Sequence, residues 1–202
     1  MNLPTIIFTT FWQANKIIED KGCSLSRDGK IFYLKLVKNC YFVNSISLSC
    51  PDINKLKWIF EFQKKSLFKL GFLCPQYEML AEYKKNKDWN LFEKKYINLI
   101  NKRKEEITNW LFSLKNDSVY FLCCWENTSG KANCHRKTLY DIFNKSKKMN
   151  DKFNLFYMHG DYKEHDIENV IQAGRDGYIS FVTNQSAQFI TNQSVQYRFN
   201  NN

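Results

Sequence analysis

The segment SVYFLCCWE, residues 118–126, constrains the fold of this chain more than any other stretch. It is a dense run of strand-forming apolar residues, and it follows Asn116 and Asp117, which are typical turn residues. A strand without polar alternation is usually covered on both faces, as in parallel sheets flanked by helices. After a polar loop, CHRKTLYDIFNKS (134–146) predicts a helix. The sequence therefore predicts an α/β fold with residues 118–126 as a central strand.

Other segments fit the same architecture. Their β-branched and aromatic residues favour strands, and Asp28-Gly29 between two apolar stretches favours a tight hairpin. The expected result is a compact, mostly parallel sheet flanked by helices, with a β-hairpin inserted near the N-terminus. In chain order the segments are a strand over 5–11, a short helix over 12–22, the hairpin over 23–37, a strand over 41–51 and a strand over 152–160.

Residues 52–115 are predicted to be mainly helical. Apolar residues recur at helical spacing over 53–72, and again in the stretch that begins after Pro75. The opposite face of this second stretch is basic. Such a face is usually just solvated, but it would also suit the phosphates of a nucleic acid. The candidate nucleic-acid surface consists of Lys84, Lys85, Lys94, Lys95, Lys102 and Arg103.

The chain carries a net charge of +10, which favours phosphate-bearing partners or an anionic surface. The abundance of lysine together with asparagine and isoleucine offers a plainer explanation, namely a general compositional bias. A nucleotide or a nucleic acid is the partner that the charge predicts.

The seven cysteines are odd in number and contain no CxxC pair. This pattern indicates neither a disulfide scaffold nor a zinc ribbon, and it favours reduced thiols in the cytoplasm. No stretch reaches 18 apolar residues, and the first residues lack the features of a signal peptide. We therefore expect no membrane span.

The C-terminal part has a different composition. TNQSAQFI (183–190) is followed directly by TNQSVQYR (191–198), a near-exact repeat of eight residues. The repeat is too short for a solenoid, and its composition suits two short strands or a flexible polar tail. The predicted organisation is an α/β domain over 1–160 and an extension over 161–202.

The junction between residues 124 and 136 holds most of the reactive groups. Strand alternation places Cys124 and Glu126 on one face, with Glu126 at the carboxyl end, where open α/β sheets bind ligands. The helix that begins near Cys134 presents free backbone N–H groups that favour an anion, and Arg136 could clamp the same anion. The helix start, Arg136 and Lys137 are expected to lower the pKa of the Cys134 thiol.

The same stretch resembles the domain of unknown function 488 family. The resemblance rests on Cys124-Trp125-Glu126 at the end of an apolar strand and on Cys134-His135-Arg136 at a helix start. A Leu-x-Pro segment opening a basic helical stretch (73–96) and the strand SISLSCP (45–51) add to it. It covers residues 5–145 and implies a compact α/β fold, but it supplies no activity. The hairpin insertion and the longer loop NTSGKAN (127–133) depart from the family pattern.

The leading hypothesis is a nucleotide- or nucleic-acid-directed protein with an anion pocket at this junction. Glu126 and Cys134 are the candidate catalytic residues, and Cys124, His135 and Arg136 are the candidate ligand-binding residues. The plainer interpretation is an ion pair between Glu126 and Arg136 that holds the loop to the helix.

Three alternatives stay open. A reactive-thiol enzyme would use Cys134, although the adjacent His135 points elsewhere and is a poor base for it. A metal enzyme would use ligand types that zinc or iron accepts, here Cys124, Glu126, Cys134 and His135. A binding module without catalysis is the third. The leading hypothesis includes no metal ligand, and the sequence assigns no cofactor and no oligomeric state.

Overall fold

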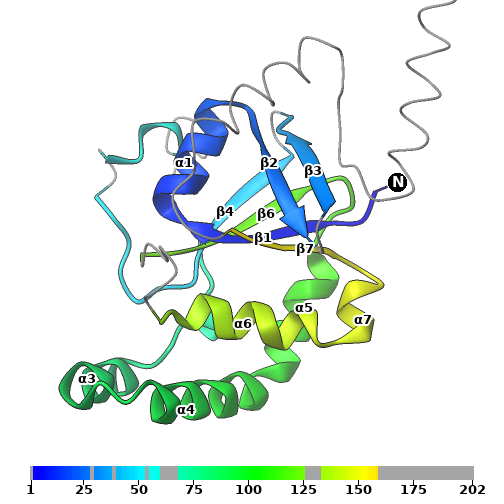
Figure 1. The fold of residues 1–202 in the computed structure, drawn as a ribbon. Helices are drawn as coiled ribbons and strands as arrows, with labels where there is room; N and C mark the ends of the chain where they lie inside the picture. Colours follow the sequence, from blue (N-terminus) through cyan, green and yellow to red (C-terminus); the bar gives the residue numbers. More distant parts are fainter. Residues whose placement is uncertain are drawn as a thin grey trace, which may run out of the picture.

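The computed structural model describes residues 2–27, 30–37, 40–52, 55–59, 68–125 and 133–158. A five-stranded parallel sheet forms the centre of the described part (Figure 1). Its strands run in the order β5-β4-β6-β1-β7. Their bounds are Thr5–Thr10 for β1, Tyr41–Ser45 for β4, Phe68–Lys69 for β5, Val119–Cys124 for β6 and Asn154–Tyr157 for β7. The α/β prediction is confirmed.

Strands β1 and β6 lie side by side at the middle of the sheet. Their register pairs Thr5 with Val119 and Thr10 with Cys124. Every residue of both strands is buried. The burial explains why both segments are apolar or β-branched without alternation, because helices or the hairpin cover each face.

Helix α1 (Phe11–Glu19) and the hairpin of β2 (Gly22–Arg27) and β3 (Lys30–Lys35) cover one face of the sheet (Figure 1). Helix α1 begins in a capping box: the Thr10 hydroxyl accepts from the backbone N–H of Gln13, and the Gln13 side chain accepts from the backbone N–H of Thr10. The predicted hairpin is confirmed in its two antiparallel strands. Its Asp28-Gly29 turn lies outside the described residues.

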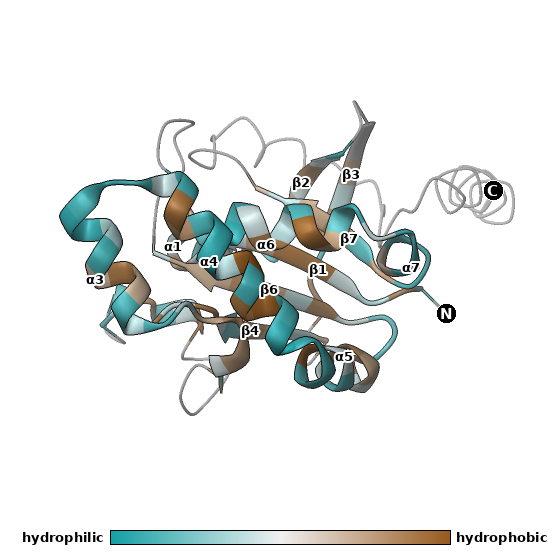
Figure 2. Cartoon of the chain, turned by 90° about the horizontal axis from the view of Figure 1, so that it is seen from below, coloured by the Kyte–Doolittle hydropathy of each residue, from teal (hydrophilic) through white to brown (hydrophobic). Residues whose placement is uncertain are grey.

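The other face is covered by a layer of helices (Figure 1). These helices mix hydrophilic and hydrophobic stretches, as amphipathic helices do (Figure 2). In α4 the buried positions are Phe92, Tyr96, Leu99 and Ile100, which recur at the helical spacing predicted for the stretch after Pro75. The bounds are Tyr77–Asn86 for α3, Trp89–Lys102 for α4, Lys104–Ser113 for α5, His135–Asn144 for α6 and Lys147–Asn150 for α7.

The prediction of a helix over 53–72 is wrong for the last residues of this range. Residues 57–59 are helical, residues 60–67 lie outside the described part, and Phe68–Lys69 form strand β5. A 3₁₀ turn over Gly71–Leu73 follows. The edge of β4 offers backbone hydrogen-bonding groups, and the segment pairs with Asn44 and Ser45 there instead of continuing a helix.

The predicted boundary near residue 160 and the extension over 161–202 with its TNQS repeat lie outside the described residues. None of the described helices is long and apolar enough to cross a membrane.

Candidate metal centre

The chain reverses its direction of travel across the sheet between β1 and β6. Strand β1 leads into α1 on one face, while β6 leads towards α6 on the other (Figure 1). The segments that follow these two adjacent parallel strands therefore leave the sheet on opposite faces. Such switch points are where open α/β sheets bind their ligands.

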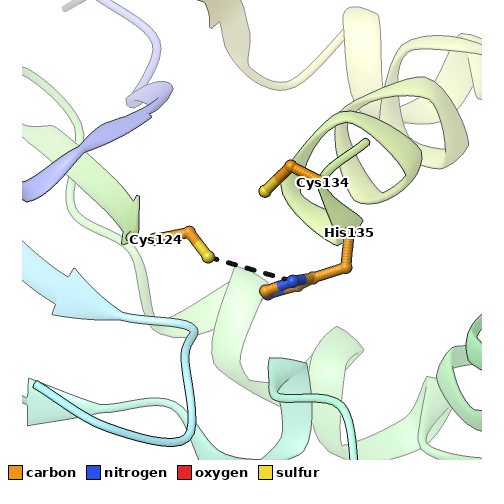
Figure 3. Close-up of side chains that lie close together, drawn as sticks. All are labelled: Cys124, Cys134 and His135. Carbon is orange, nitrogen blue, oxygen red and sulfur yellow. Dashed lines mark hydrogen bonds between the residues drawn. The ribbon is translucent and has the colours of Figure 1, made fainter. Parts of the chain in front are cut away.

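Three side chains of metal-ligand type converge at the end of β6. Cys124 is the last residue of β6, Cys134 is the N-cap of α6, and His135 is the first residue of α6 (Figure 3). Their ligand atoms all lie within 4.8 Å of one another. The Cys124 Sγ lies 3.8 Å from the Nδ1 atom of His135. The side chains are 1%, 3% and 4% exposed, respectively.

The ring of His135 is held in one orientation. Its Nε2 atom lies 2.8 Å from the carbonyl oxygen of Ile46, just after strand β4. A carbonyl oxygen can only accept a hydrogen bond, so Nε2 carries the proton and donates. In the neutral ring Nδ1 is then unprotonated and directs its lone pair towards the two thiols. This is the arrangement by which proteins orient a metal-binding histidine through a backbone carbonyl.

Tyr96 supports the same ring from the helical layer. The centroids of the Tyr96 and His135 rings are 5.3 Å apart in an edge-on arrangement. The Tyr96 hydroxyl donates to the carbonyl oxygen of Leu73 at 2.7 Å, which fixes the phenol in the core. Burial raises the pKa of this phenol well above its ordinary value, so it stays neutral.

The predicted low pKa of Cys134 is wrong. The hydrogen bond with Cys124 and the burial of the thiol raise its pKa far above the ordinary value. The expected helper Lys137 forms an ion pair with Asp141 on its own helix. Cys134 is therefore a protonated, buried thiol near neutral pH, which is a poor nucleophile.

Arg136 lies in the core and has no exposed surface. Its guanidinium carbon lies 5.4 Å from the centroid of the Tyr157 ring, on strand β7. This burial differs from the predicted anion clamp, which needs a guanidinium that a solvated anion can reach. Glu126 lies outside the described residues, so its predicted pairing with Arg136 stays a prediction.

Trp125 ties the end of β6 to the segment after β4. Its indole N–H donates to the carbonyl oxygen of Ser49 at 2.7 Å, and its ring packs edge-on against Phe11. The segment that follows β4 thus makes two contacts with the site. The Ile46 carbonyl oxygen binds His135, and the Ser49 carbonyl oxygen binds Trp125, the residue directly after β6. Sequence reasoning missed Ile46 and Tyr96, because a backbone carbonyl leaves no residue signature and a helical tyrosine is indistinguishable from ordinary core.

The predicted nucleic-acid surface is divided between two roles. Lys84, Lys85, Lys94, Lys95 and Lys102 are exposed on α3 and α4, and Lys95 forms an ion pair with Glu82. Arg103 is half-buried and donates to the carbonyl oxygens of Cys74, Phe72 and Gly71. Arg103 therefore joins the α4–α5 corner to the 3₁₀ turn, in addition to any role on the surface.

No protein-family model, no curated protein and no solved structure matches this chain. The resemblance to the domain of unknown function 488 family therefore stays a prediction. It rests on Cys124, Glu126 and Cys134-His135-Arg136, and the structure brings three of these residues together.

Proposed function

We propose that this chain is a metal-dependent protein whose ion, zinc or iron, is held by the sulfur atoms of Cys124 and Cys134 and by Nδ1 of His135. The hydrogen bond from His135 to Ile46 carries the proposal, because it leaves Nδ1 as the ring atom that faces the two thiols. Thiolate and imidazole ligands suit zinc and iron better than magnesium or calcium. The three ligand atoms lie within 4.8 Å of one another, which is close enough for them to bind the same ion.

Cys124, Cys134 and His135 would hold the ion as three protein ligands. When bound, an ion of this kind would act as a Lewis acid and would lower the pKa of water that binds to it. Two residues of the chain position the metal-binding side chain of His135. The Ile46 carbonyl oxygen orients its ring, and Tyr96 packs against that ring. The reaction class that this supports is metal-assisted attack of water on a substrate bound at the switch point.

An anionic substrate is the class that the charge favours. The chain carries +10, and exposed lysines line α3 and α4. We propose a nucleotide or another phosphate-bearing molecule as that substrate, because a basic surface raises the local concentration of such molecules. Glu126, two residues after Cys124, is the proposed general base.

The first test is the metal content of protein purified anaerobically and reconstituted with zinc or ferrous iron. We expect one ion per chain, and loss of that ion in Cys124→Ser, Cys134→Ser and His135→Ala. The matched control is Cys74→Ser, which alters a buried thiol that donates to the carbonyl oxygens of Ser47 and Leu70. Cobalt substitution should add a thiolate charge-transfer absorption that the same three variants lose.

The second test separates catalysis from a structural ion. Reconstituted protein is incubated with a panel of nucleotides and phosphate esters, with and without a chelator. Metal-dependent turnover that Glu126→Gln abolishes without loss of the ion supports the enzyme. A stoichiometric ion without turnover identifies a structural metal site. Protein that binds no ion after reconstitution contradicts the proposal as a whole.

A further inference from the structure

A pocket lies in the helical layer, away from the metal centre. It has a volume of about 380 Å³ and lies between α4, α5, α6 and α7. This volume falls within the range of small-molecule sites. The pocket reaches Phe143, eight residues along α6 from His135, which corresponds to about 12 Å of helix. It is therefore separate from the Cys124, Cys134 and His135 cluster.

The floor of the pocket is apolar. Ile100, Ile107, Phe143 and Phe153 are buried side chains that line it, and they come from α4, α5, α6 and the residue before β7. They belong to the core cluster that packs the helices against the sheet. A ligand in this pocket would therefore bury apolar surface against rigid elements.

The rim of the pocket is basic. Lys104, Lys148 and Lys152 line it and are exposed, whereas none of the described residues that line it is acidic. Glu105, Glu106 and Asp151 are near in sequence but do not line the pocket. The ammonium groups of Lys148 and Lys152 lie 5.7 Å and 4.9 Å from the centroid of the Phe112 ring, which is 61% exposed. Two cations are thus held beside an apolar opening.

We propose that this pocket binds a small organic anion with an apolar body, of the medium-chain fatty-acid class. The chain of the ligand contacts the floor formed by Ile100, Ile107 and Phe153. Its carboxylate lies at the rim, where Lys148 and Lys152 supply charge-assisted hydrogen bonds.

The test compares octanoate with octan-1-ol, which has the same chain without the charge, by isothermal titration calorimetry on the full chain. We expect octanoate to bind one-to-one and octan-1-ol to bind at least about tenfold more weakly, the factor that one charge-assisted hydrogen bond provides. The Lys148→Met/Lys152→Met double variant should weaken octanoate binding by at least the same factor. The matched control is Lys84→Met/Lys85→Met, which removes two exposed lysines from α3.

A third variant, Thr108→Trp, fills the pocket from α5 and should abolish binding of both compounds while the far-ultraviolet circular dichroism stays unchanged. Equal affinity for octanoate and octan-1-ol would overturn the anionic part of the proposal. The whole proposal is overturned if octanoate does not bind at millimolar concentration, or if the α3 control weakens binding as much as the rim variant. The protein is titrated with and without reconstituted metal. Because the pocket is separate from the metal centre, we expect the same affinity for octanoate in both cases.

Discussion

His135 and Ile46 are 89 residues apart in the chain, yet the imidazole Nε2 lies 2.8 Å from the Ile46 carbonyl oxygen. The exit of strand β4 therefore determines which nitrogen of the ring faces Cys124 and Cys134. Without this bond the His135 ring could adopt the other tautomer or another orientation, and its Nδ1 atom would not face the two thiols.

Zinc should stabilise the folded protein through this centre. An ion that binds only the native state adds about 2.7 kcal/mol at a free concentration one hundred times its dissociation constant. We expect differential scanning fluorimetry to show a higher midpoint for the wild type in buffered zinc. Cys124→Ser should show no such increase, while Cys74→Ser should respond like the wild type. An equal response in Cys124→Ser would place any bound zinc elsewhere.

Arg136 should be a stability residue. The Arg136→Ala variant removes a fully buried guanidinium that lies over Tyr157, and we expect a loss of roughly 3–5 kcal/mol in urea unfolding. If Glu126 is its predicted partner, the Arg136→Ala/Glu126→Gln double variant should regain much of that loss. A loss near 1 kcal/mol, typical of a surface position, would favour the ligand-binding role instead.

Cys134 should react slowly with iodoacetamide at neutral pH. Its thiol is 3% exposed, and the hydrogen bond with Cys124 together with burial raises its pKa, whereas Cys50 is exposed. Mass spectrometry of timed alkylations should therefore find Cys50 modified well before Cys134 and Cys74. In urea the three cysteines should react at similar rates. Faster labelling of Cys134 in the folded protein would restore the reactive-thiol hypothesis.

Tyr41 should make the fold sensitive to alkali. Burial raises the pKa of its phenol to about 12, while an unfolded tyrosine titrates near 10. The unfolded state therefore loses this proton first, and the associated stability, complete below about pH 10, is lost as the pH rises towards 12. The Tyr41→Phe variant should lose less stability than the wild type between about pH 10 and 12. The free energy of unfolding of both proteins is measured in urea at several pH values in this window. An equal loss in the two proteins would contradict the prediction.

If the lysines of α3 and α4 contact phosphates, binding of nucleic acid should fall steeply with salt. Each phosphate contact removed should reduce the slope of log K against log salt by about 0.7 to 0.9. Fluorescence anisotropy with single- and double-stranded DNA and RNA at two salt concentrations measures this slope. The Lys94→Met/Lys102→Met variant should lower it, and Lys148→Met, on α7, is the control. Absence of binding at low salt would leave only a small-molecule substrate.

Local sequence determined the parts of the fold that depend on the spacing of apolar residues along a strand or a helix. The apolar run Val119–Cys124 predicted a doubly covered strand, and the apolar positions of α4 are the ones that pack. Asp28-Gly29 predicted the hairpin, and its strands β2 and β3 pair antiparallel as expected. The pattern of residues 134–146 predicted the helix at whose start Cys134 and His135 lie.

Tertiary structure decided the rest, since it depends on groups that are distant in the chain. Phe68 and Lys69 carry a helical pattern but pair with the edge of β4, whose backbone bonds outweigh a weak local preference. The pKa of the Cys134 thiol is raised by its hydrogen bond with Cys124 and by burial, and not lowered as the position at a helix start had predicted. The orientation of His135 came from a carbonyl oxygen of Ile46, and every sequence has such an oxygen at every position. Only the packing of β4 beside β6 brings that one oxygen to the imidazole.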